Sequence, residues 1–256
     1  MTDEFNLDKY IVKPDRLSEP EMILLYGPPG GGKTWLAHSI SEVEGLYPVL
    51  SIDTEGSTQG TIDDFDKDRI DVIRPQVVFP KNEYIGTRTV IEGLLEKEHK
   101  WKTVIIDVAD VLQEWSIAEG KQTGDGFAQW NFTHDELTAP PNLKKGVRGL
   151  FHRLKAADFL TILVIHDKQE SLNEEGTLTY GTVQWQGQGK TKIGGIPDMV
   201  GYVTRDTNSG GVSKTTLHSA PTKKFLAKNR FNLPAKIEDP SMAKIYEMIR
   251  NRKEEN

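Results

Sequence analysis

The chain has 256 residues, of which 27% are charged and 36% hydrophobic, with a net charge of −6 and no cysteine. This balance is typical of a folded domain that is large enough to bury its own core. The lack of cysteine excludes disulfides, cysteine nucleophiles, iron–sulfur clusters and thiolate zinc sites. The apolar runs are too short to span a bilayer and the first ten residues are charged, so we expect no membrane partner and a cytoplasmic location.

The charge is unevenly distributed along the chain. Residues 1–110 have a net charge of −9, whereas between Pro141 and Lys236 there are 15 basic side chains against 7 acidic ones, a net charge of +8. Such a basic stretch either marks a face that binds a polyanion or is a chance imbalance on a solvated surface.

Residues 1–21 are interpreted as a polar lead-in and residues 22–256 as one domain. Short apolar runs predict strands and longer amphipathic runs predict helices. The predicted strands are 22–26, 47–52, 69–73, 103–108 and 159–165. A helix is expected after the glycine-rich segment that follows the first strand, another over 85–97, and a third after the fourth strand to about residue 117. This alternation predicts an α/β fold, mostly a parallel sheet with helices on both faces.

The remaining segments are two long polar stretches and a C-terminal extension. Loops are expected over 119–141 and 167–197, a length that is typical of functional or disordered segments. Two further strands, 199–205 and 213–219, are predicted to form an antiparallel extension joined by a turn at 208–211. Asp239 and Pro240 are interpreted as the N-cap and first position of a final helix.

The phosphate-loop pattern G-x-x-x-x-G-K-[ST] is matched in full by Gly27, Pro28, Pro29, Gly30, Gly31, Gly32, Lys33 and Thr34. Backbone N–H groups can surround a polyphosphate only where no side chain intervenes, which glycine allows. The following helix is expected to point its positive dipole end at the phosphates. We expect Lys33 to reach the β- and γ-phosphates and the Thr34 hydroxyl to ligate Mg²⁺. The alternative is an ordinary glycine-rich turn.

A phosphate loop needs a carboxylate at a neighbouring strand end to hold hydrated Mg²⁺, and Asp107 ends such a strand. Hydrolysis needs a second acid to activate water, and many such enzymes place a glutamate where this chain has Val108. The candidate is instead Glu55, just beyond the second strand, because ligand chemistry gathers at strand ends of open parallel sheets. Glu55 is either this general base or a solvated loop side chain, and Asp53 is a candidate to cap or to order the loop.

His166 follows the predicted strand 159–165. At this strand end a polar side chain would lie beside the γ-phosphate and could sense hydrolysis. The alternative is a histidine that is merely hydrogen-bonded. The six histidines show no metal-ligand spacing, so no zinc site is expected.

These motifs in this order resemble the RecA-like ATPases. The resemblance runs from about Met22 to Arg230, and more narrowly the chain looks like the phage P-loop ATPases of the single-strand annealing type. It implies a RecA-like P-loop core, ATP and Mg²⁺ as cofactors, and the cytoplasm of the host cell if the chain is phage-encoded. It also implies a homo-oligomeric ring or filament with nucleotide between subunits. Val108 departs from the family, in which serine often follows the strand aspartate.

The same resemblance implies a single-stranded DNA partner, because two loops at the places of 119–141 and 167–197 bind DNA in that family. The second loop contains Lys190 and Lys192 near aromatic residues, a combination that suits base stacking and phosphate neutralisation. Between the loops, a basic stripe at helical spacing either tracks phosphates or is a solvated face, and it consists of Lys144, Arg148, His152 and Lys155. The aromatic residues either stack on bases or pack within their own loops.

Lys228 and Arg230 are two residues apart on a predicted extended segment, so their side chains point the same way. RecA-like oligomers often carry a lysine-x-arginine pair at a comparable place, and the resemblance therefore implies a finger that reaches the γ-phosphate on a neighbouring subunit. The alternative is an edge strand kept soluble by its charges.

The predicted function is a Mg²⁺-dependent ATPase in phage-type DNA recombination, repair or single-strand annealing. A nucleotide or small-molecule kinase is one alternative, although the chain has no arginine-rich cluster of the kind that forms a kinase lid. A nucleotide-gated binding module with little turnover is the other, in which Glu55 is not catalytic.

Overall fold

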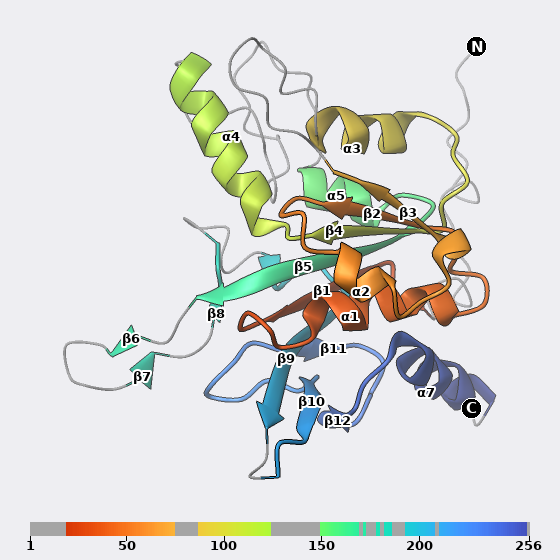
Figure 1. The fold of residues 1–256 in the computed structure, drawn as a ribbon, viewed down its shortest axis with the longest axis vertical. Helices are drawn as coiled ribbons and strands as arrows, with labels where there is room; N and C mark the ends of the chain where they lie inside the picture. Colours follow the sequence, from red (N-terminus) through yellow and green to blue (C-terminus); the bar gives the residue numbers. More distant parts are fainter. Residues whose placement is uncertain are drawn as a thin grey trace, which may run out of the picture.

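The computed structural model describes residues 19–74, 87–123, 149–168, 171–172, 178–179, 182–185, 193–207 and 210–254. The main sheet has the strand order β3-β2-β4-β5-β1-β9-β10-β12, with helices on both faces (Figure 1). Its first five strands in chain order pair in parallel, namely β1 (Met22–Gly27), β2 (Val49–Asp53), β3 (Ile70–Ile73), β4 (Thr103–Asp107) and β5 (Leu160–Lys168). The predicted α/β class with a mostly parallel sheet is confirmed.

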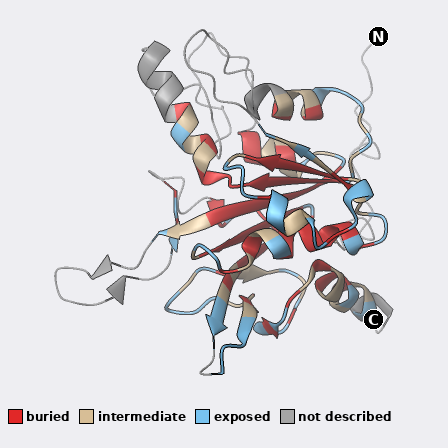
Figure 2. Ribbon diagram, viewed as in Figure 1, coloured by how far each residue is buried: buried red, intermediate tan, exposed pale blue. Residues whose placement is uncertain are grey.

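The central strands β1, β2 and β4 are buried at every residue, as Figure 2 shows, whereas the edge strand β3 is partly exposed. Continuous apolar runs of this kind are typical of parallel strands that are covered on both faces. The lack of polar alternation in these segments is therefore a consequence of the helices above and below them.

The register of the parallel strands brings the predicted polar residues to one edge of the sheet. Gly27 pairs with His166, Asp107 with Val164, and Asp53 with Asp107. Because β5 lies between β1 and β4, His166 is interposed between the phosphate loop and the end of β4. The carboxyl ends of β1, β2 and β4 therefore lie around one site with His166, which lies within β5 because this strand continues past its predicted end to Lys168.

Each face of the sheet has its own core (Figure 1). On one face, α3 (Thr87–Glu96), α4 (Asp110–Thr123) and α5 (Leu150–Lys155) pack on the strands through Ile91, Leu94, Leu112, Phe151 and Leu154. On the other face lie α1 (Lys33–His38), the 3₁₀ helix Ser39–Glu42 and α7 (Met242–Glu254), which bury Leu36, Ile40, Met242, Ile245, Tyr246 and Ile249. The short helix α2 (Gln59–Ile62) lies beside α1.

The sheet continues past β1 into a C-terminal extension. β9 (Met199–Thr207) is parallel to β1, and β10 (Ser213–His218) and β12 (Lys236–Glu238) then add in antiparallel order. β11 (Lys228–Asn229) pairs antiparallel with the start of β9. The predicted antiparallel extension is thus confirmed. Within the part of the chain that the structure describes, no helix has the length and apolar content needed to cross a bilayer.

Several predicted boundaries were wrong. The last helix begins at Met242 rather than Pro240, because Ser241 Oγ accepts the N–H of Lys244 at 3.2 Å, while Asp239 takes a left-handed φ of 44° and donates its N–H to β10. Helix α4 runs on to Thr123, into the predicted loop 119–141. The second predicted loop contains the short strands β6 (Ser171–Leu172), β7 (Leu178–Thr179) and β8 (Thr182–Val183). Part of the predicted turn 208–211 lies outside the described residues.

Replacing Ile245 with alanine should lower the free energy of unfolding by about 2–5 kcal/mol, the usual cost of emptying a packed site. Ile245 is fully buried where α7 packs on the sheet. Tyr246→Phe is the matched control: the buried Tyr246 hydroxyl has no hydrogen-bond partner among the described residues, so its loss should leave stability unchanged or higher. Urea unfolding measures both, and equal losses in the two variants would contradict this view of the α7 contact.

Candidate nucleotide site

The phosphate loop joins β1 to α1, and its backbone conformation requires glycine at several positions. A Cβ on Gly27 would lie 2.1 Å from the carbonyl oxygen of Val203 on β9. Gly30 and Gly32 have φ values of 73° and 91°, which residues other than glycine rarely adopt. These constraints explain why glycine occupies these positions of the loop.

Lys33 folds back over this loop and is 6% exposed. Its Nζ donates to the carbonyl oxygens of Gly27 and Pro28, at 2.8 Å in each case. Burial lowers the pKa of the ammonium, and the nearby carboxylates, led by Asp167 and Asp107, oppose that change. Lys33 is thus held within electrostatic reach of the strand-end carboxylates that the sequence predicted around it.

Thr34 and Asp107, the two predicted metal ligands, meet behind the loop. The Thr34 side chain is hydrogen-bonded to the Asp107 carboxylate, which is 2% exposed. Burial raises the pKa of Asp107 to about 6, against the opposing effect of this hydrogen bond. Asp107 Oδ2 is buried with no hydrogen-bond partner among the described residues. A hydroxyl beside an unpaired buried carboxylate oxygen fits Mg²⁺, which prefers oxygen ligands.

His38, which the sequence analysis did not single out, fixes the position of the first turn of α1. It is fully buried, with Nδ1 2.8 Å from the Thr34 carbonyl oxygen and Nε2 2.9 Å from Ser51 Oγ on β2. A carbonyl can only accept, so Nδ1 carries the proton and Nε2 accepts from Ser51. Burial lowers the pKa of His38, which favours this neutral form. The ring thereby ties the Thr34 backbone to the strand that leads to Asp53.

Asp53 orders the loop that carries Glu55. Its carboxylate accepts the backbone N–H groups of Gly56 at 2.7 Å, Ser57 at 3.1 Å and Thr58 at 3.3 Å. Arg74 Nε donates to the same carboxylate at 3.2 Å. Asp53 is 2% exposed, so these bonds supply the compensation that a buried charge needs. Of the two roles left open for Asp53, the structure supports loop ordering.

Glu55 and His166 face each other across the site, with Glu55 Oε2 4.0 Å from His166 Nε2. The Glu55 side chain is 39% exposed, so it is open to water. On the other side of the ring, His166 Nδ1 lies 3.0 Å from Oδ2 of Asp110. The structure therefore adds Asp110, the first residue of α4, to a carboxylate–imidazole–carboxylate row.

Asp110 determines the tautomer of His166 and favours its protonated form. A carboxylate accepts hydrogen bonds, so Nδ1 carries a proton and Nε2 is the nitrogen that faces Glu55. The hydrogen bond that His166 donates to Asp110 raises the pKa of His166, partial burial opposes this change, and Glu55 raises the pKa further. Sequence reasoning missed Asp110, although an acidic residue three positions after the strand aspartate Asp107 was the available signal.

A cavity of about 610 Å³ opens beside the phosphate loop. It is lined by Gly30–Trp35 and by Gly60, Thr61, Asp64, Arg205, Thr215, Asp239 and Pro240. The volume suits a small ligand. Arg205, Thr215 and Asp239 come from the C-terminal extension and were not predicted. Another hollow has a volume of about 850 Å³ and is lined by residues that include His99, Trp101 and Phe159. It lies near the amino-terminal ends of β4 and β5 and contains none of the predicted site residues.

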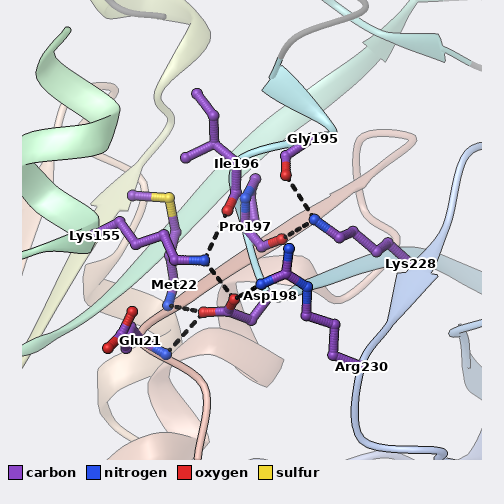
Figure 3. Close-up of polar contacts among 9 residues, drawn as sticks. All are labelled: Glu21, Met22, Lys155, Gly195, Ile196, Pro197, Asp198, Lys228 and Arg230. Atoms are coloured by element: carbon purple, nitrogen blue, oxygen red, sulfur yellow. Dashed lines mark hydrogen bonds and ion pairs between the residues drawn. The ribbon is translucent and has the colours of Figure 1, made fainter. Parts of the chain in front are cut away.

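The other predicted site residues are not at the phosphate loop. Lys228 and Arg230 lie at the opposite edge of the sheet, beside the start of β9 (Figure 3). Lys144, Arg148, Lys190 and Lys192 lie outside the described residues. The basic stripe between the loops was also predicted to include Lys155 as a solvated or phosphate-tracking side chain. This was wrong for Lys155, because its ammonium pairs with Asp198 and donates to the Ile196 carbonyl at 3.0 Å.

A parallel sheet whose strand ends surround a phosphate loop in this way defines a P-loop nucleotide-binding domain. The chain belongs to the AAA-domain family, whose model matches residues 19–231. A search of curated proteins found no match. Among solved structures, the chain is similar to the RadB recombinase, at 13% identity over 85% of each chain, with a TM-score of 0.42.

Replacing Asp110 with asparagine should lower the pKa of His166, because the ring loses its anionic acceptor while its partial burial remains. Imidazole NMR titration of the free protein measures this directly. Asp71→Asn is the matched control, since Asp71 lies on the edge strand β3, away from His166, and pairs with Lys100 and Trp101. An unchanged His166 pKa in Asp110→Asn would show that the 3.0 Å contact does not control the ring.

Proposed function

We propose that this protein is a RecA-like ATPase that acts on single-stranded DNA in phage-type recombination, repair or strand annealing. One observation supports the ATPase part above all others. The strand register brings the Thr34–Asp107 pair, Glu55 and His166 to the edge where the phosphate loop lies. This arrangement combines groups for holding a metal, activating water and sensing phosphate at one edge of the sheet.

In this proposal Thr34 and Asp107 hold Mg²⁺, which supplies charge neutralisation for the phosphates when it is bound. Lys33 exchanges the carbonyl oxygens of Gly27 and Pro28 for phosphate oxygens, to which an ammonium binds more strongly. Glu55 accepts the proton of the attacking water, for which its exposed carboxylate is suitably open. His166, held by Asp110, donates from Nε2 toward the γ-phosphate when the ring is protonated.

We also propose that the protein works as a homo-oligomer with the nucleotide between subunits. Within one chain Lys228 and Arg230 lie at the opposite edge of the sheet from the phosphate loop, so they cannot serve their own site without a large rearrangement. This separation supports action on the nucleotide of a neighbouring subunit, where a cation would stabilise the transition state.

The proposal of a DNA partner rests on the basic region of the sequence and on the resemblance to DNA-binding ATPases. Lys190 and Lys192 in the second loop are the proposed phosphate contacts, and Lys144 and Arg148 are further candidates. Asp167, which begins this loop region, accepts a hydrogen bond from the Tyr202 hydroxyl at 3.2 Å and is the carboxylate that most strongly opposes the lowered pKa of Lys33. The second loop thus begins beside the nucleotide site.

The ATPase rate with and without single-stranded DNA tests the proposal, with Glu55→Gln as the decisive variant. The substitution keeps the shape of the side chain but removes its basicity, so turnover should fall by at least about 100-fold while ATP affinity stays the same. Phosphate release and nucleotide binding measure the two quantities. Normal turnover in the variant would place the base elsewhere. Phosphoryl transfer to a small acceptor would instead favour a kinase, and binding without turnover a nucleotide-gated module.

Replacing Lys190 and Lys192 together with alanine should weaken single-strand binding and flatten its dependence on salt. Each phosphate contact that is lost should reduce the slope of log K against log salt concentration by about 0.7. Fluorescence anisotropy with a labelled oligonucleotide at several salt concentrations measures this slope. Lys223 and Lys224, replaced in the same way, provide a control pair from an exposed segment. An identical slope in the loop variant and the unmodified protein would exclude these lysines as phosphate contacts.

A further inference from the structure

A buried carboxylate, Asp198, organises the sheet edge opposite the phosphate loop (Figure 3). Asp198 is 6% exposed, and its Oδ2 accepts the backbone N–H groups of Glu21 at 3.1 Å and Met22 at 3.3 Å. Its Oδ1 accepts from Lys155 and, at 2.8 Å, from Arg230. The carboxylate is therefore fixed to the first residue of β1 and holds Arg230 directly.

The segment 195–198 also binds Lys228. Lys228 Nζ donates to the carbonyl oxygens of Gly195 and Pro197, at 2.6 Å each. As Figure 3 shows, the Lys228 ammonium and the Arg230 guanidinium lie side by side on this segment although they come from another part of the chain. Both members of the proposed finger pair are thus held by four consecutive residues that precede β9.

The charges of this cluster are not balanced. Lys155, Lys228 and Arg230 surround a single buried carboxylate. Burial lowers the pKa of Lys228, and the charges of Arg230 and Lys155 lower it further. A surplus of partly buried positive charge is favourable only if it meets an anion.

Arg230 is the member of the cluster that can reach such an anion. Only its Nη1 is engaged by Asp198, and its side chain is 55% exposed. Its Nε and second Nη have no hydrogen-bond partner among the described residues, and they belong to the same rigid planar group. Fixing one nitrogen therefore fixes the direction in which the others point.

We propose that Asp198 is the positioning residue of the Lys228–Arg230 pair. Its carboxylate holds Arg230 through one nitrogen and aims the remaining donors outward, at a phosphate group of the nucleotide bound to a second copy of this chain. This inference rests on the proposed action of the pair between subunits. It adds that the geometry of the finger is set within its own subunit before assembly, so that less side-chain entropy is lost when the anion is met.

A structural role for Asp198 is the competing explanation, because its carboxylate, just before β9, joins β1, α5 and the residue that follows β11. The two roles differ in which subunit's nucleotide site loses activity when Asp198 is replaced. A structural defect damages the site of the altered subunit, whereas a misdirected finger damages the site of its neighbour. Mixing variants separates these outcomes.

The experiment uses Asp198→Asn, which keeps the shape of the side chain but removes its charge, together with Lys33→Ala and Arg230→Ala. Asp198→Asn alone should lower kcat about 100-fold with unchanged ATP affinity, the effect expected of a misplaced catalytic group. Mixed one to one with Lys33→Ala, it should regain about a quarter of the unmodified rate, because one interface in four then joins an intact loop to an intact finger. Asp71→Asn, a lysine-paired carboxylate on β3, is the control and should keep full activity.

The mixtures distinguish the two proposals. If Arg230→Ala with Lys33→Ala restores nothing, action between subunits is wrong. If that mixture restores activity, two results would still show that the positioning role is wrong. Asp198→Asn could be fully active by itself, or it could be inactive and remain so when it is mixed with Lys33→Ala. Arg230→Lys provides a test in case Asp198→Asn does not fold, since lysine keeps the charge beside Asp198 but lacks the planar fork. It should lose kcat to the same extent as Arg230→Ala, and full activity of Arg230→Lys would overturn the proposal.

Discussion

The burial of three carboxylates, two at the ends of β2 and β4 and one at the start of α4, is the constraint on which the nucleotide site depends. A buried charge is tolerated only when hydrogen bonds or opposite charges compensate it. Asp53 is compensated by backbone N–H groups and Arg74, and Asp110 Oδ2 by His166, whereas Asp110 Oδ1 has no hydrogen-bond partner among the described residues. Among the described residues, the Thr34 hydroxyl and the charge of Lys33 oppose the effect of burial on Asp107, and burial raises its pKa to about 6. These three environments explain why one carboxylate orders a loop, one holds a histidine and one suits a metal.

The same sheet separates two sets of charged groups. Its carboxyl-end edge carries the phosphate loop and the acids, and its other edge carries the surplus cations around Asp198. β1 connects them directly, because its last residue, Gly27, begins the loop while the N–H of its first residue, Met22, binds Asp198. A chain with complementary charges on opposite edges is suited to head-to-tail association, in which each subunit meets the next in the same way. This geometry supports the oligomeric ATPase that we propose.

Much of the fold could be predicted from the sequence because its strands are short, continuous and apolar. The continuous apolar segments that form β1, β4 and β5 predict strands that are buried on both faces of a parallel sheet. Boundaries were less accurate where several residues can perform the same local role. Asp239 and Ser241 are both good N-caps, and only the contact of Asp239 with β10 assigns the cap to Ser241. Similarly, polarity alone did not show that α4 continues to Thr123.

By itself the sequence determined the phosphate loop and its strand-end acid Asp107, since glycine spacing and a terminal aspartate have local physical reasons that need no partner from elsewhere. Only the tertiary structure decided the roles of Asp110 and Asp198. Each acts through a residue distant in sequence, His166 in one case and Arg230 in the other, and the partners are 56 and 32 residues apart. No periodicity or motif encodes such pairs, because they depend on strand order and register, which are fixed when the whole sheet forms.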